Sequence, residues 1–185
     1  MYLEQRAAED TLFAKNNVAA SIWENAIMGY HRATGFHPKW LIPRRQAMEF
    51  TDRVVQDFDV KVQNLENHIG SLSGGNIQKL IVGREFSQNN RLLLIEDPTR
   101  GIDVGAIEFI RKKIVDMRAR KKAILLVSAD LSEILSLSDT ILVMHEGRIV
   151  GHISDVKNTS ENDLGLYMLG VKEDSKEQIG GAYCE

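Results

Sequence analysis

The chain has 185 residues, enough for one modest domain or for two subdomains that share a core. Its 43% hydrophobic and 26% charged residues are typical of a globular protein, and the net charge of −3 gives no reason to expect nucleic acid as a partner. The apolar runs, such as Ile141–Met144, are far too short to span a bilayer. The N-terminus lacks the order of a signal peptide, and Cys184 is the single cysteine, so we expect a cytoplasmic domain without a disulfide.

Before residue 90, apolar residues recur at helical spacing and predict a small helical subdomain. Val18, Ile22 and Ala26 share one face of a first expected helix. A second helix is expected to start at Pro43, because proline favours the first position of a helix. Another helix should follow the glycines and serines around Gly70–Gly75.

After residue 90, strands and helices alternate. Short apolar runs predict strands at Leu92–Ile95, Ala123–Val127 and Thr140–Met144, the first of them fully buried. A short helix is expected at Leu131–Leu137, and Arg148–Ile153 should pair back on the preceding strand as a hairpin. This alternation predicts an α/β fold with a mostly parallel sheet flanked by helices. The strands are too few to close a core, which indicates half of a larger domain.

The organisation that we expect has three parts: a helical subdomain over residues 1–90, an α/β part over residues 91–172, and a polar, flexible tail over residues 173–185.

The segment Leu72–Lys79, with the sequence Leu-Ser-Gly-Gly-Asn-Ile-Gln-Lys, combines glycines with the start of an amphipathic helix. Backbone N–H groups at a helix start face the positive end of its dipole, and the missing side chains let an anion approach them. Ser73 adds a hydroxyl group. A glycine-rich loop that merely caps a helix would show the same residues, so this segment alone does not decide its role.

About twenty residues later, the apolar run Leu92–Ile95 ends in the acids Glu96 and Asp97. A buried strand that ends in two acids can present one to the ligand shell of Mg²⁺ and the other to an attacking water. A solvated acidic loop is the alternative. The joint occurrence and the spacing of the two segments favour a nucleotide site.

Together these segments resemble the ATP-binding-cassette (ABC) ATPase family over roughly residues 10 to 170. Leu72–Lys79 is similar to the signature motif in the form seen in sugar and nucleoside importers. Leu92–Asp97 resembles the Walker B strand, and Gly101–Asp103 the D-loop. Pro98–Ala106 is typical of the subclass that serves simple sugars and nucleosides. The resemblance implies a partial P-loop NTPase fold, the C-terminal part of the second of two cassettes, with residues 91–172 as half of its RecA-like core.

The resemblance also implies roles for individual residues. In the family's head-to-tail dimer each signature faces the ATP of the opposite cassette, so the partner's ATP would be bound by Ser73, Gly74, Gly75 and Asn76. Gly101 and Asp103 take D-loop positions. Glu96 takes the metal-side position, and Asp97 that of the residue that polarises the attacking water.

The implied cofactors are ATP and Mg²⁺, and the implied partners are permease subunits, a partner cassette and a separate solute-binding protein. The resemblance places the chain peripherally on the inner face of the cell membrane. It implies energy coupling for an importer of simple sugars or nucleosides.

Three features depart from the family pattern. The phosphate-loop sequence Gly-x-x-x-x-Gly-Lys-Ser/Thr is absent, which we interpret as truncation, since the family places that loop upstream. The usual order of Asp then Glu is reversed in Glu96-Asp97, and the switch histidine after the strand-end serine is replaced by Ala129. Displacements near an ångström cost orders of magnitude in rate, so we expect a degenerate hydrolytic site and negligible ATPase activity of the chain alone.

The alternatives are a non-catalytic structural or regulatory module that docks on a permease or on another ATPase, and an unrelated α/β binding protein in which the motifs coincide by chance. The altered acids and Ala129 support the first of these.

Overall fold

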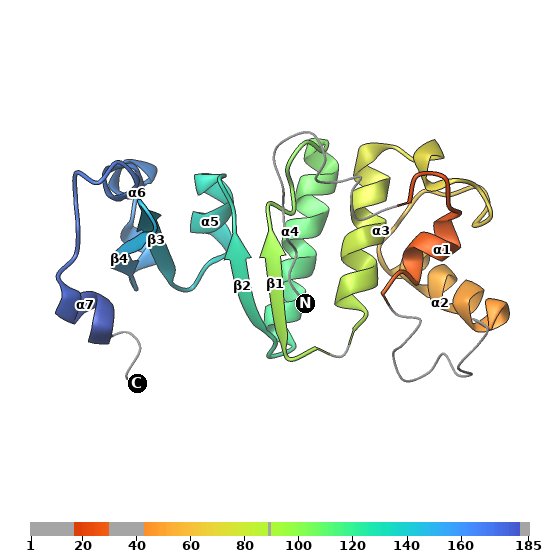
Figure 1. Cartoon of the computed structure of the whole chain (residues 1–185), viewed down its shortest axis with the longest axis horizontal. Helices are drawn as coiled ribbons and strands as arrows, with labels where there is room; N and C mark the ends of the chain where they lie inside the picture. Colours follow the sequence, from red (N-terminus) through yellow and green to blue (C-terminus); the bar gives the residue numbers. More distant parts are fainter. Residues whose placement is uncertain (1–16, 30–42, 89, 182–185) are drawn as a thin grey trace. The chain divides into compact units, whose positions relative to one another are not determined.

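The structure, a computed structural model, describes residues 17–29, 43–88 and 90–181 (Figure 1). It divides into two compact units. The first holds the chain up to Leu94 and returns with Pro98–Ile124, whereas the second holds Ile95–Asp97 and the chain from Leu125 on. The three-part organisation expected from the sequence stays a prediction, and its segments 1–16, 30–42 and 182–185 lie outside the described residues.

The first unit is mainly helical. Its elements are α1 (Ile22–Ala26), α2 (Arg44–Asp57), the 3₁₀ turn η1 (Ile69–Ser71), α3 (Gly74–Phe86) and α4 (Val104–Ala119). Figure 1 shows α3 with α4 on one side and with α1 and α2 on the other, and α3 contacts all three helices. Helix α3, which begins in the segment that resembles the signature motif, is thus the centre of this unit.

Phe58, just after α2, fixes how α2, α3 and α4 pack. Its ring lies edge-on to those of Phe86 in α3 and Phe109 in α4, with centroids 6.2 and 6.3 Å away. On α3, a Cβ atom at Gly83 would lie 2.7 Å from the Val54 side chain and 2.8 Å from the Phe58 ring. The helices therefore approach at a residue without a side chain, and the aromatic rings fill the space beside it.

The strands β1 (Leu92–Glu96) and β2 (Ala123–Val127) form a parallel pair, as the sequence predicted. The Ala123 N–H donates to the Arg91 carbonyl at 2.9 Å near one end of the pair. The prediction that the first strand is fully buried was wrong, because its side chains alternate: Leu93 and Ile95 are buried, whereas Leu92 is 60% exposed. An apolar run indicates a strand but not whether both of its faces are covered.

The second unit contains α5 (Leu131–Leu137), β3 (Ile141–His145), β4 (Arg148–Ile153), the 3₁₀ turn η2 (Val156–Asn158), α6 (Glu161–Met168) and α7 (Lys176–Gly181). As predicted, β4 pairs antiparallel with β3. Both turn residues, Glu146 and Gly147, have positive φ angles of 46° and 75°, the type I′ geometry that suits a two-residue hairpin. The apolar core lies between the hairpin and α6 and is made by Ile141, Val143, Val150, Val156, Leu164 and Tyr167.

Several apolar side chains on the strands of the second unit face solvent. In β2, Leu125 is 53% and Val127 50% exposed, and in β3 Met144 is 63% exposed. No helix in the described part of the chain is long and apolar enough to cross a membrane.

Candidate functional site

The signature segment, residues 73–76, forms the first turn of α3 in the first unit. Ser73 has extended backbone angles and caps the helix, its hydroxyl oxygen accepting from the Asn76 backbone N–H at 3.4 Å and from the Asn76 side-chain amide at 2.9 Å. Ser73 and Gly74 are exposed, and a Cβ atom at Gly74 would meet nothing within 4 Å. The start of α3 at Ser73 and Gly74 is therefore open to solvent, as an anion site requires.

Contacts to the chain after α2 hold this turn in place. The side-chain oxygen of Asn76 accepts from the Lys61 backbone N–H at 2.8 Å. One turn along α3, the Lys79 ammonium donates to the Asp59 carbonyl at 3.3 Å and lies 3.6 Å from its carboxylate. The same ammonium lies 4.6 Å from the centroid of the Phe109 ring. Lys79 is thus engaged within the unit, whereas Ser73 and Gly74 face outward.

Gly75 is the buried member of the signature segment, and it lies against Asp103, a residue of the predicted D-loop. A Cβ atom at this position would be 2.6 Å from Oδ2 of Asp103. The other carboxylate oxygen of Asp103 accepts from the Ala106 N–H at 2.9 Å and so caps α4. Gly101 has a φ of +72°, which favours glycine. The structure therefore brings together two segments that the sequence named separately.

A second contact joins α3 to the loop before α4. The side-chain amide of Gln78 donates to the carbonyl of Pro98 at 2.7 Å, and the hydrogen bond is buried. Gln78 is 8% exposed and Pro98 less than 2%. Sequence reasoning did not single out Gln78, although a glutamine among the apolar positions of a helix is a signal that its amide needs a partner.

In the second unit, Asp97 lies against the segment that follows β2. Its backbone N–H donates to the Val127 carbonyl at 2.8 Å, and its carboxylate accepts from the Ala129 backbone N–H at 3.0 Å. The φ of Asp97 is +39°, an uncommon conformation for a residue other than glycine. The water-polarising position and the switch position of the resemblance are therefore adjacent, and the contact between them uses the backbone of Ala129.

Glu96 ends β1 and is half-buried. Among residues 17–29, 43–88 and 90–181, no group of three or more histidine, cysteine or acidic side chains is placed to hold a metal ion. A Mg²⁺ ion near Glu96 would need phosphate oxygens and waters as its other ligands, which is how this ion usually binds beside nucleotides.

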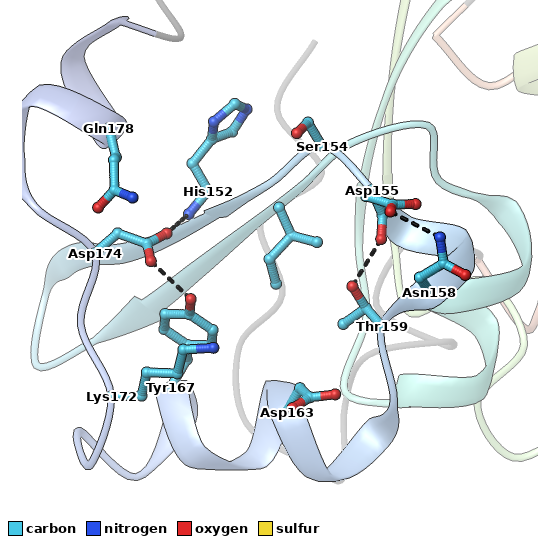
Figure 2. A pocket seen from close by; sticks show the side chains of 11 residues that line it. His152, Ser154, Asp155, Asn158, Thr159, Asp163, Tyr167, Lys172, Asp174 and Gln178 are labelled. Atoms are coloured by element: carbon cyan, nitrogen blue, oxygen red, sulfur yellow. Dashed lines mark hydrogen bonds between the residues drawn. The ribbon is translucent and has the colours of Figure 1, made fainter.

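The second unit also has a polar hollow of about 530 Å³, shown in Figure 2, which the sequence did not predict. Its carboxylates are engaged by the protein itself. Asp174 accepts from the Tyr167 hydroxyl at 2.7 Å and from the His152 backbone N–H at 2.8 Å, and Asp155 accepts from the Asn158 amide at 2.8 Å (Figure 2). These contacts fasten the segment before α7 to β4 and α6, so we assign the hollow no ligand.

The environment of this hollow shifts two pKa values. Burial of Asp174 works to raise its pKa, but the hydrogen bonds from His152 and Tyr167 and the nearby Lys172 outweigh it and hold the pKa below its usual value. Burial, together with the hydrogen bond to Asp174, raises the pKa of Tyr167. Both groups therefore keep their ordinary charge at neutral pH, which is consistent with a structural role.

Comparison with known proteins finds import ATP-binding proteins among the sequence relatives of this chain. The chain is 37% identical over 160 residues to the guanosine import ATP-binding protein NupO of Bacillus subtilis, covering 86% of this chain and 31% of that protein. It is 44% identical over 117 residues to the nucleoside import ATP-binding protein NupA of Lactococcus lactis, covering 63% of this chain and 23% of that protein. The ribose import ATP-binding protein RbsA of Yersinia pestis is 37% identical over 139 residues, with 75% and 27% covered.

Solved structures agree in fold. An ATP-binding cassette of an ABC transporter in its ADP conformation matches with a TM-score of 0.59 at 17% identity, covering 90% of this chain and 63% of that one. An ATP-binding subunit of an ABC transporter matches with a TM-score of 0.62 at 19% identity, covering 83% and 64%. The chain is a homologue of ABC import ATP-binding proteins.

The chain spans between about a quarter and a third of the length of the curated relatives it matches, namely 31%, 23% and 27% of NupO, NupA and RbsA. No known family profile matches it. The predicted P-loop NTPase fold of the ABC cassette type is confirmed. The roles of individual ABC motif residues stay predictions, although the structure brings Gly75 to Asp103 and Asp97 to Ala129.

Proposed function

We propose that this chain serves, within a complete subunit, as the signature-bearing part of the ATPase that energises an importer of simple sugars or nucleosides. Its signature segment completes an ATP site whose phosphate loop comes from a partner cassette. The names of the relatives support the transported class, since they import guanosine, nucleosides and ribose. A solved dimeric cassette with ADP and phosphate, with a TM-score of 0.58, supports a paired arrangement.

The observation that carries this proposal is the asymmetry of the signature turn. Ser73 and Gly74 face solvent at the start of the 13-residue helix α3, whereas Gly75 is buried against Asp103. Backbone N–H groups and a hydroxyl at a helix start suit the oxygens of a phosphate, and the open space at Gly74 lets a large ligand approach. The turn therefore supplies groups that can bind phosphate, although this chain has no phosphate-loop sequence.

Gly74 gives the sharpest test, because a side chain there meets no part of the chain. In the full subunit, assembled with its permease in proteoliposomes, Gly74→Trp should abolish ATP-driven uptake by blocking the approach of phosphate. The matched control is Gly165→Trp, at another glycine with open space around it. Equal thermal unfolding midpoints would show that both variants fold. Normal uptake by Gly74→Trp would show that the signature turn is not needed for ATP-driven uptake.

The chain's own acidic site has, in this proposal, little hydrolytic capacity. The carboxylate of Asp97 is held by the Ala129 backbone N–H at 3.0 Å, and Ala129 has no side chain that could donate to a γ-phosphate or accept a proton. Mg²⁺ would be approached by Glu96 through water, and the ion would supply charge stabilisation to the phosphates. The purified chain should release no phosphate from Mg-ATP above background. A steady rate that Asp97→Asn removes would contradict this.

A non-catalytic docking module is the second candidate, favoured by the Glu96-Asp97 order and by Ala129. It predicts that the full subunit binds its permease or partner cassette with the same affinity with and without ATP. The importer proposal instead places the subunit on the inner face of the membrane with permease subunits, a partner cassette and a separate solute-binding protein. It predicts that ATP changes these affinities.

A further inference from the structure

Two contacts, about one helical turn apart on α3, join this helix to the loop of residues 98–103. At Gly75 the backbone comes so close to the Asp103 carboxylate that a Cβ atom would lie 2.6 Å from it. At Gln78 the side-chain amide donates to the Pro98 carbonyl at 2.7 Å. The loop is therefore held to the signature helix at both of its ends.

The Gln78 contact is the stronger constraint because it is buried. Separation of helix and loop would leave the buried Gln78 amide without its acceptor, so the hydrogen bond resists that separation. Pro98 is among the most completely buried residues of the chain, and Thr99 beside it is 7% exposed. The start of the loop is thus packed as a core element and not as a mobile surface turn.

The two joined segments serve different ATP sites in the function proposed above. Pro98 directly follows Asp97, the water-polarising position of the chain's own site. The signature segment at the start of α3 faces the ATP of the partner cassette. A displacement of the loop must therefore move the signature turn as well, unless the Gln78 hydrogen bond breaks.

We propose that Gln78 is a positioning residue of the ATPase: its side-chain amide sets the place of the signature turn relative to the loop that directly follows the acidic pair. This inference rests on the proposed function. Because Gln78 is buried and its amide donates to Pro98, it acts through the signature turn and not by contact with nucleotide.

The test uses Gln78→Met, which keeps the length of the side chain but removes the amide, and Gln78→Glu, which keeps the shape but has no N–H when ionised. The control is Gln56→Met, since the Gln56 amide donates at 2.7 Å to the exposed Asp52 of its own helix. Hydrogen exchange is measured first on this chain. In both Gln78 variants, the amides of residues 74–76 and 99–103 should exchange faster by a similar factor, whereas Gln56→Met should change neither segment.

Turnover is then measured in the full subunit assembled with its permease. Gln78→Met should lower kcat for ATP at least fivefold and leave KM within twofold, because the binding groups remain while their placement changes. A merely structural residue would lower stability without this split. Unchanged kcat, or faster exchange in only one of the two segments, would overturn the inference. Absence of ATP hydrolysis by the wild-type assembly would instead overturn the proposed function, and the exchange data would still decide whether Gln78 joins helix and loop.

Discussion

Gly75 and Asp103, 28 positions apart in the sequence, are in such close contact that only a residue without a side chain fits at position 75. A Cβ atom there would lie 2.6 Å from the Asp103 carboxylate oxygen Oδ2 and 3.2 Å from Cβ of Ala106. The carboxylate is not free to swing away at no cost, because its other oxygen caps α4 at the Ala106 N–H. The second glycine of the signature is thus required by the fold of this chain, whatever it does for a nucleotide.

We therefore expect Gly75→Ala to destabilise the chain by about 1–3 kcal/mol, the usual cost of forcing atoms into a packed site. The neighbouring change Gly74→Ala is the control, since its Cβ atom meets nothing within 4 Å. It should be neutral or stabilising by up to about 1 kcal/mol, because alanine has less freedom in the unfolded chain. Urea unfolding of the two variants measures the difference, and equal stabilities would contradict the close approach.

Asp103→Ala should relieve this clash while it removes the cap of α4. Alone it should cost about 1 kcal/mol, as expected for loss of an aspartate cap. In the Asp103→Ala variant, Gly75→Ala should lower the unfolding free energy less than it does in the wild-type chain. The double-mutant cycle should therefore give a favourable coupling between the two changes. Strict additivity of the two unfolding free energies would show that Asp103 is not what excludes a side chain at position 75.

Gly83 and Gly165 should respond to alanine in opposite directions although both lie within helices. At Gly83 a Cβ atom would lie 2.7 Å from Val54 and 2.8 Å from Phe58, so we expect a loss of about 1–3 kcal/mol. At Gly165 no atom lies within 4 Å, so the better helix propensity of alanine should stabilise α6 by about 0.5–1 kcal/mol. Thermal unfolding of both variants checks the signs.

Stability should fall in acid partly through Asp174. Its pKa in the folded chain lies below the ordinary value of 3.8, so its contribution is present above pH 3.8 and is lost as the pH falls below it. Asp174→Asn should therefore make the urea midpoint less sensitive to pH below pH 3.8. Glu173→Gln, a change at the neighbouring acid, serves as the control. If both variants have the same pH dependence as the wild type, the link between Asp174 and acid stability is wrong.

At constant neutral pH, Tyr167→Phe removes the hydroxyl that donates to Asp174 at 2.7 Å. Loss of one hydrogen bond of this kind should cost about 0.5–1.5 kcal/mol in unfolding free energy. The ring itself remains in place against Gly151, where a Cβ atom would lie 2.7 Å from it, so the core packing is kept. An unchanged urea midpoint would mean that solvent replaces Asp174 as the hydroxyl's partner.

The sequence predicted most elements because local patterns decide them. The short helix at Leu131–Leu137 and the hairpin of β3 and β4 were found from the spacing and the order of the apolar runs. The bounds of β1 and β3 differ by one residue from those predicted. The first and last residues of a strand depend on hydrogen bonds to its neighbour, and the apolar pattern of the sequence does not contain these. Whether both faces of β1 are covered depends on long-range packing, and the prediction of a fully buried strand was wrong.

The candidate site was predicted as motifs but not as contacts. Nothing in the spacing of Gly75 and Asp103 says that their atoms touch, and the role of Gln78 depends on a carbonyl twenty residues away. Backbone acceptors such as that of Pro98 are present at every residue, so sequence alone cannot select one. The Asp97–Ala129 hydrogen bond escaped prediction for the same reason, because its donor is a main-chain N–H.

The exposure of Leu125 and Val127 on β2 and of Met144 on β3 affects how stable this polypeptide is in a cell. Exposed apolar residues on strands favour aggregation, binding by chaperones and degradation by proteases. Expressed by itself, the chain should be short-lived and prone to inclusion bodies, and its yield should depend strongly on growth temperature and on chaperone supply.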